Sequence, residues 1–247
     1  MNTEMHVGAQ HAVPLRRIPR PALMLVTDRH TAPQGEMVRV VEQAVAGGVN
    51  MVQLREKDLP ASELLELGLA LKHAIAGRAL LIVNDRVDVA AILDADGVQL
   101  PENGLSVSAA RKILGPHKLI GRSVHSEEGA KIAAAQGADY LVLGTVFPSA
   151  SHADEEPLGL DVLRYLLLGI PLVSAQVADL TDLREDVQEV APVPVLAIGG
   201  ITAENAAEVL STGAAGVAVI SSILRAHDPR KAARELRAEL GVEGGTG

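Results

Sequence analysis

Residues 133–145 read AAAQGADYLVLGT, and their order indicates the fold class: the end of a helix, a glycine, and then a short apolar run. The same order recurs as AVAGGVNMVQLRE at residues 44–56 and as VLSTGAAGVAVIS at residues 209–221. Glycine at a helix C-terminus lets the chain turn back, and a continuous apolar run is typical of a parallel strand buried on both faces. Each segment therefore predicts the junction of helix and strand in a repeated βα unit.

Alternation of apolar runs with helical spacing continues along the whole chain and gives eight such units. We predict strands at 23–27, 51–55, 80–84, 97–100, 119–124, 140–144, 195–198 and 216–220. Predicted helices follow them at 36–46, 62–76, 87–93, 107–114, 127–136, 160–168, 203–211 and 229–240. Eight units favour a closed (β/α)8 TIM barrel over an open sheet, which more often has a Gly-rich turn after its first strand. Here residues 27–30 read TDRH, without a glycine.

The length of 247 residues matches one barrel domain. We predict a flexible N-terminal arm over residues 1–20, the barrel over 21–242 and a tail over 243–247. An insertion at about 170–192 is expected between the sixth and seventh strands, because that connection is longer than one helix and a turn require.

Composition excludes several classes of function. The chain has no cysteine, which excludes disulfides, thiolate metal sites and a cysteine nucleophile. A net charge of −9 argues against broad contact with nucleic acid, which requires clustered Lys and Arg. Residues 1–20 contain no apolar run long enough for a signal peptide or a membrane span. We therefore expect a cytoplasmic protein with a small substrate and no membrane partner, and we leave room for a homo-oligomer.

Functional residues of a (β/α)8 barrel lie at the carboxyl ends of its strands. After the last two strands, glycines expose main-chain N–H groups and a helix begins, so an anion such as phosphate can bind there without a cationic side chain. The four candidates are Gly199, Gly200, Ser221 and Ser222. The alternative is that the two glycines only make a tight turn.

Charged residues after the second and third strands form another candidate group. Alternation along a strand places Gln53 and Arg55 on the same face, and an inward-facing Arg55 meets an anionic ligand at the barrel mouth. The alternative is that Arg55 and Lys57 form ion pairs with nearby acids. Asn84 and Asp85 are suited to orienting a ligand or binding hydrated Mg²⁺, although an aspartate at a strand end is often a helix N-cap.

His125 follows the fifth strand, whose end directs it into the mouth. An imidazole gives and takes protons near neutral pH, so we predict His125 as a catalytic acid and base. Ser123, two residues earlier on the same strand, is a predicted substrate contact. The alternative for His125 is a structural histidine bonded to the backbone.

At these residues the chain resembles the thiamine phosphate synthase and thiazole tautomerase superfamily. The similar stretches are LVTD, VQLREK, VNDRVDVA, DGVQLP, IGRSVHS, ADYLVLGTVFP, PVLAIGGIT and AGVAVISSI, in family order from Leu25 to Ile223. The resemblance implies a (β/α)8 fold and a role in thiamine biosynthesis. It also implies a thiazole phosphate whose phosphate binds at the glycines and serines after the last two strands.

The synthase branch of the superfamily joins a hydroxymethylpyrimidine diphosphate to thiazole phosphate with Mg²⁺ and releases pyrophosphate. The residues that match its diphosphate and metal site are Arg55, Lys57, Asn84 and Asp85. Two parts of its pattern differ here: residues 100–104 read LPENG, without the second metal-binding aspartate, and residues 148–152 read PSASH, without the usual lysine. Loss of a carboxylate and a cation counts against this activity, with Glu102 as a candidate substitute ligand.

The tautomerase branch is similar at VQLP and IGRSVHS and needs no metal. Its matching histidine is His125, the implied acid and base that converts a thiazole carboxylate phosphate to its aromatic tautomer. We therefore predict a thiazole tautomerase without a cofactor. The alternative is a thiamine-phosphate synthase, for which Asp85 becomes a Mg²⁺ ligand. A third hypothesis is a non-catalytic protein that binds thiazole or thiamine phosphate.

Overall fold

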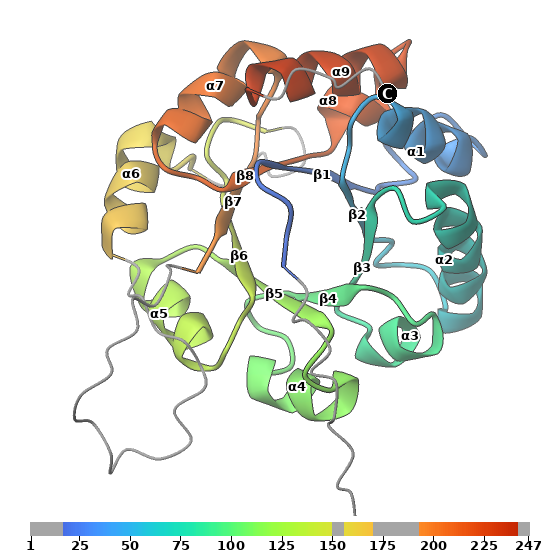
Figure 1. The fold of residues 1–247 in the computed structure, drawn as a ribbon, viewed down its shortest axis with the longest axis horizontal. Helices are drawn as coiled ribbons and strands as arrows, with labels where there is room; N and C mark the ends of the chain where they lie inside the picture. The colour runs from blue at the N-terminus through green and yellow to red at the C-terminus, as the bar shows by residue number, and fades with distance from the viewer. Residues whose placement is uncertain (1–16, 150–155, 170–192, 242–247) are drawn as a thin grey trace, which may run out of the picture.

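The computed structural model describes residues 17–149, 156–169 and 193–241. Its eight parallel strands form a closed barrel with helices around it (Figure 1). Neighbouring strands pair in chain order, and β8 closes against β1 through the pairing of Leu23 with Val217. The predicted fold class is confirmed, and the predicted strands begin and end within one residue of the observed ones.

The strands are β1 (Ala22–Val26), β2 (Met51–Leu54), β3 (Leu80–Asn84), β4 (Gly97–Leu100), β5 (Leu119–Val124), β6 (Tyr140–Leu143), β7 (Val195–Ile198) and β8 (Gly216–Val219). The helices are α1 (Met37–Ala46), α2 (Ala61–Ile75), α3 (Val87–Ile92), α4 (Val107–Leu114), α5 (Glu127–Ala135), α6 (Gly159–Gly169), α7 (Ala203–Ser211), α8 (Ser221–Leu224) and α9 (Pro229–Glu239). The one-turn helix α8 is not among the predicted helices. Across the described ranges, no helix is both long and apolar enough to span a bilayer.

The strands separate two apolar cores. One face of each strand packs against the helices, whereas the other fills the barrel with side chains that include Met24, Ile82 and Leu196. Tyr140 is the largest fully buried side chain inside the barrel. It fits because Gly121 faces it: a Cβ on Gly121 would lie only 2.3 Å from Tyr140 Cζ. Val, Leu, Ile and Met fill most of the remaining interior, as the scarcity of aromatic residues requires.

The first described residues already belong to this core. Ile18 is 7% exposed and packs with the side chains inside the barrel, so the packed chain reaches into the arm predicted for residues 1–20. The rest of that arm lies outside the described residues, as do the predicted insertion at 170–192 and the tail at 243–247. Those parts of the domain assignment stay predictions.

A repeated polar contact joins pairs of strands at the amino-terminal end of the barrel. The residue before an even-numbered strand donates its N–H to the second residue of the preceding strand, and its side-chain oxygen accepts the N–H of that same residue. The three pairs are Asn50 with Leu23, Asp96 with Leu81 and Asp139 with Ile120, with side-chain contacts of 2.8, 2.8 and 2.7 Å. Before β8 stands Ala215, which can make only the main-chain bond, to Val195.

Candidate active site at the carboxyl ends of the strands

The ends of β7 and β8 form one small pocket. Gly199, Gly200, Ser221 and Ser222 all line it, together with Thr145 from the segment after β6. Within the described residues, the N–H groups of Gly200, Ser221 and Ser222 have no hydrogen-bond acceptor. Main-chain N–H groups gathered in this way can bind an anion. The structure therefore brings together the four residues predicted to hold phosphate, and we call this pocket the phosphate cradle.

Both glycines of the phosphate cradle are fixed by backbone geometry and by close packing. Gly199 and Gly200 have φ angles of +103° and +63°, in the left-handed region that disfavours side chains. A Cβ on Gly199 would lie 2.6 Å from Thr145 Cγ2, and one on Gly200 would lie 2.5 Å from the Pro148 carbonyl oxygen. The glycines make a turn, as the alternative predicts, and they also line the pocket.

The hydroxyl of Ser222 has a structural partner. It donates to the carbonyl oxygen of Ile201, so Ser222 can offer the cradle its N–H rather than its hydroxyl. Asn205 fixes the same turn from α7, because its Nδ2 donates to Gly200 O at 3.0 Å and its Oδ1 accepts the N–H of Thr202 at 2.9 Å. These bonds fix the turn that carries the cradle.

Gln53 and Arg55 continue the inner face of β2 toward the mouth. Gln53 is buried, and its Nε2 contacts the sulfur of Met24, inside the barrel, at 3.4 Å. The main chain of Arg55 is fixed by its N–H, which donates to Thr27 Oγ1 at 2.9 Å. Gln53 therefore faces the barrel interior, and strand alternation gives Arg55 the same direction.

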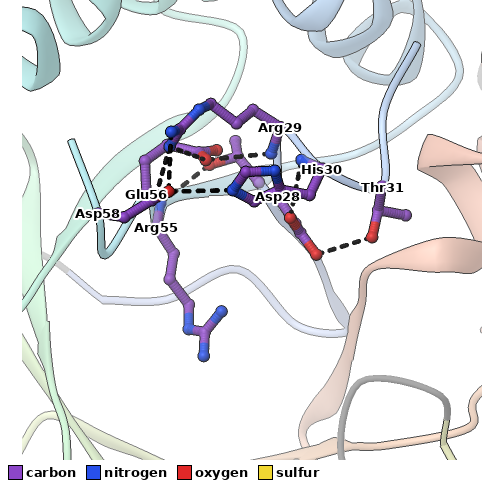
Figure 2. A network of polar contacts seen from close by, with 8 residues as sticks. Asp28, Arg29, His30, Thr31, Arg55, Glu56 and Asp58 are labelled. Carbon is purple, nitrogen blue, oxygen red and sulfur yellow. Dashed lines mark hydrogen bonds and ion pairs between the residues drawn. The ribbon is translucent and has the colours of Figure 1, made fainter. Parts of the chain in front are cut away.

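The charged residues around Arg55 form polar contacts with one another, and the side chain of Arg55 takes no part in them (Figure 2). Arg29 binds both carboxylate oxygens of Asp58, and its main-chain N–H donates to the buried Glu56 at 3.0 Å. His30 Nε2 contacts Asp58 at 3.0 Å. The side chain of Arg55 extends away from this network, as Figure 2 shows. The sequence analysis missed the network, although alternating charges after the first two strands were a sign of it.

Arg55 and Lys57 make no ion pair within residues 17–149, 156–169 and 193–241. The alternative, that both cations pair with nearby acids, is therefore wrong for these residues. The positive charge of Arg55, and then partial burial, lower the pKa of Lys57, while Asp85 acts in the opposite direction. The two cations repel each other beside a single carboxylate. We call Arg55, Lys57 and Asp85 the cationic wall.

Asp85 follows the half-buried Asn84 at the end of β3, with a left-handed φ of +61°. Helix α3 begins after Arg86 without a side-chain cap, so the N-cap alternative for Asp85 is wrong. The carboxylate lies next to Gly104, where a Cβ would be 3.1 Å from Asp85 Oδ1. Gly104 belongs to the stretch LPENG at residues 100–104, which lacks the second aspartate of the synthase pattern. A second carboxylate there would stand beside Asp85.

His125 lies in a different part of the mouth. Its Nδ1 is 2.7 Å from Glu102 Oε2, which gives it a carboxylate partner rather than the backbone partner of the structural alternative. Both side chains line a cavity of about 440 Å³. The other lining residues are Gly144, Thr145, Glu156 and Leu158. We call Glu102, His125 and Glu156 the acidic wall.

Two further residues shape this region, and both lie at strand ends where functional residues are expected. Arg122 donates to the carbonyl oxygens of Glu102 and Leu105, the latter at 2.6 Å, and its burial lowers its pKa while Glu102 opposes that shift. Gln99 is buried and donates from Nε2 to Ser123 Oγ at 3.0 Å. A glutamine within an apolar strand was the available sign of this contact. The predicted substrate contact Ser123 is therefore held from inside the barrel.

Comparison with known proteins adds a family to this geometry. Residues 23–223 match the family model described as thiamine monophosphate synthase. The chain belongs to this family. It is 46% identical over 222 residues to a putative thiamine-phosphate synthase of Geobacter sulfurreducens, covering 89% of this chain and 94% of that protein. It is 41% identical over 216 residues to a thiamine-phosphate synthase of Pyrococcus furiosus, covering 87% and 92%.

Solved structures agree with the family assignment. The thiamine phosphate pyrophosphorylase of Pyrococcus furiosus aligns with a TM-score of 0.73 at 39% identity, covering 89% of this chain and 95% of that one. A 3-hexulose-6-phosphate synthase aligns with a TM-score of 0.63 at 19% identity, which shows the fold alone. The family members named here support an enzyme of thiamine biosynthesis. They favour the synthase alternative over the tautomerase that the sequence analysis preferred.

Proposed function

We propose that the protein is a thiamine-phosphate synthase, which joins a hydroxymethylpyrimidine diphosphate to a thiazole phosphate and releases pyrophosphate. The observation that carries this proposal is the presence of two unlike anion sites in one barrel mouth. The phosphate cradle is neutral and offers main-chain N–H groups. The cationic wall offers Arg55 and Lys57, which form no ion pair with the described residues. A condensation of two phosphorylated substrates uses both sites, one for each substrate.

The cationic wall suits the diphosphate for an electrostatic reason. When the C–O bond to the diphosphate breaks, its electron pair stays with the leaving pyrophosphate, while a thiazole ring nitrogen forms the new C–N bond. Fixed cations stabilise the negative charge that grows on the leaving group. Because Arg55 repels Lys57 in the free protein, a bound anion relieves that repulsion and raises the pKa of Lys57. The cradle holds the thiazole phosphate in the meantime.

The cationic wall can supply one protein ligand to Mg²⁺. This ion commonly binds through one or two carboxylates together with substrate phosphates. No group of three acidic or histidine side chains able to hold a metal occurs in the described part of the chain. Glu102, the candidate substitute ligand, bonds to His125 instead. Asp85 would therefore hold Mg²⁺ jointly with the substrate diphosphate, and the bound ion would neutralise charge on the departing pyrophosphate.

The test is a condensation assay with both substrates and Mg²⁺. We expect thiamine phosphate and pyrophosphate in equal amounts, measured by chromatography and by a coupled pyrophosphate assay. The His125→Gln variant, tested in parallel, should retain condensation because His125 belongs to the acidic wall. Absence of product at saturating concentrations of both substrates would reject the synthase proposal.

A second candidate activity is the thiazole tautomerase that the sequence analysis preferred. The observation that favours it is His125, which lines the 440 Å³ cavity with a carboxylate at its Nδ1. Conversion of the carboxylated thiazole phosphate to its aromatic tautomer by the native protein, with loss of that conversion in His125→Gln, would support it. Turnover of either substrate would exclude the hypothesis of a non-catalytic binder. A cytoplasmic location and a homo-oligomer stay predictions.

A further inference from the structure

The contact between Glu102 and His125 goes beyond the synthase proposal, because the condensation described above does not use it. We propose that Glu102 is a positioning residue that fixes His125 in a single tautomer, with the proton on Nδ1 and the lone pair on Nε2. The supporting distance is 2.7 Å between His125 Nδ1 and Glu102 Oε2. A carboxylate can only accept from this nitrogen, so Nδ1 must carry the proton.

The main chain of Glu102 is held by Arg122, and its carboxylate lies beside helix α5. Arg122, on the strand that leads to His125, donates to the carbonyl oxygen of Glu102 and to that of Leu105. Helix α5 approaches the carboxylate with a glycine: a Cβ on Gly129 would lie 3.2 Å from Glu102 Oε1. The loop between β4 and α4 thus has a fixed course beside His125. This places the carboxylate near the positive end of α5 as well.

The charged groups around His125 come from three segments. Glu102 lies on the loop after β4, Glu156 lines the same cavity after β6, and Glu127 and Glu128 lie in the first turn of α5. Glu127 is paired with Lys131 on its own helix. Among these groups, Glu102 is the one bonded to the imidazole. Its removal therefore tests one defined contact.

The fixed tautomer has a direct chemical consequence. With Nδ1–H bound to Glu102, the available nitrogen is Nε2, on a side chain that lines the cavity. Nε2 can take a proton from one atom of a bound substrate and return it to another, so the imidazole ends as it began. Glu102 keeps its charge throughout and stabilises the imidazolium formed between the two transfers.

The first test measures the tautomer in the free protein. Ring ¹⁵N resonances of His125, assigned from their absence in His125→Gln, should show a protonated Nδ1 and an unprotonated Nε2 at pH 8. Glu102→Ala should shift the ring to a mixture of tautomers, whereas Glu102→Gln should retain Nδ1–H because its carbonyl oxygen still accepts. Glu128→Ala is the matched control, since it removes a neighbouring carboxylate without a bond to His125. Glu102→Ser replaces the alanine variant if that one does not fold.

A retained Nδ1–H tautomer in folded Glu102→Ala would overturn the proposal, as would a loss of equal size in Glu128→Ala. The second test rests on the tautomerase candidate. There we expect kcat to fall on the order of 100-fold in Glu102→Ala, with KM nearly unchanged, because the base is still present but misoriented. An unchanged kcat in that variant would also overturn it. The tautomer measurement needs no substrate, so its failure and the failure of the proposed function are distinguishable.

Discussion

The two walls of the barrel mouth treat charge in opposite ways. On the cationic wall, Arg55 and Lys57 form no ion pair with the described residues, and the charge of Arg55 lowers the pKa of Lys57 although Asp85 opposes this shift. On the acidic wall, His125 and Glu102 satisfy each other before any ligand binds. Charge left unpaired is available to attract a ligand, whereas charge already paired sets the orientation of a reactive group. The barrel mouth therefore keeps unpaired charge and paired charge in separate regions.

The largest expected effect comes from neutralising the cationic wall. Arg55→Gln should lower kcat/KM for the condensation roughly 100- to 1000-fold, because a fixed donor to the leaving pyrophosphate is lost. Arg86→Gln is the control, since that arginine lies nearby but is paired with Asp88. Steady-state kinetics with both substrates measure the effect. An equal loss in the two variants would erase the distinction between paired and unpaired cations.

The phosphate cradle gives the next effect. Gly200→Ala should raise KM for thiazole phosphate roughly tenfold and destabilise the fold by about 1–3 kcal/mol, because the methyl group meets Pro148 and φ is unfavourable. Gly213→Ala is a matched control: its φ is +100°, yet nothing lies within 4 Å of the added carbon. Thermal unfolding and kinetics should show strain in both variants but a KM change in Gly200→Ala only. An unchanged KM in Gly200→Ala would indicate that the thiazole phosphate binds at another site.

Gly104 lies beside Asp85 of the cationic wall and two residues after Glu102 of the acidic wall. Gly104→Asp combined with Pro101→Ala should lower the Mg²⁺ concentration for half-maximal condensation about threefold to tenfold, since two carboxylates then face the ion. The proline change is needed because a Cβ at position 104 would lie 2.8 Å from the Pro101 ring. Asn103→Asp with the same Pro101→Ala change adds equal charge one residue away. If a Mg²⁺ titration gives the same shift for the Gly104→Asp and Asn103→Asp variants, the cause is the added negative charge and not its position beside Asp85.

The smallest effect is expected in the polar network of Arg29, His30 and Asp58. Hydrogen bonds from Arg29 and then His30 lower the pKa of Asp58 from 3.8 to about 2. Because the folded-state pKa lies below the unfolded one, the contribution of Asp58 to stability is present above pH 4 and is lost as the pH falls through 2. Asp58→Asn should therefore lower Tm slightly at pH 7, less at high salt, and not at pH 1.5. A Tm difference that persists at pH 1.5 would indicate a cause other than charge.

The fold could be read from the sequence because strands buried on both faces appear as apolar runs, bounded by glycine turns such as Gly137. The shared face of Gln53 and Arg55 followed from the two-residue period of a strand. The partner of His125 did not, since the loop that carries Glu102 has no such period and depends on Arg122. The helix α8 was missed because its four residues are too few to show helical spacing.

The polar contacts at the amino-terminal end of the barrel group its strands into pairs. Asn50, Asp96 and Asp139 each tie an even strand to its predecessor at two points, so we expect β1–β2, β3–β4 and β5–β6 to open as pairs. Ala215 leaves β7 and β8 with the sheet ladder and one main-chain bond. In hydrogen exchange, the amides tied by these side chains should be protected together, while the β7–β8 pair opens on its own. The part of the barrel proposed to hold phosphate is thus the part whose order a bound ligand can increase most.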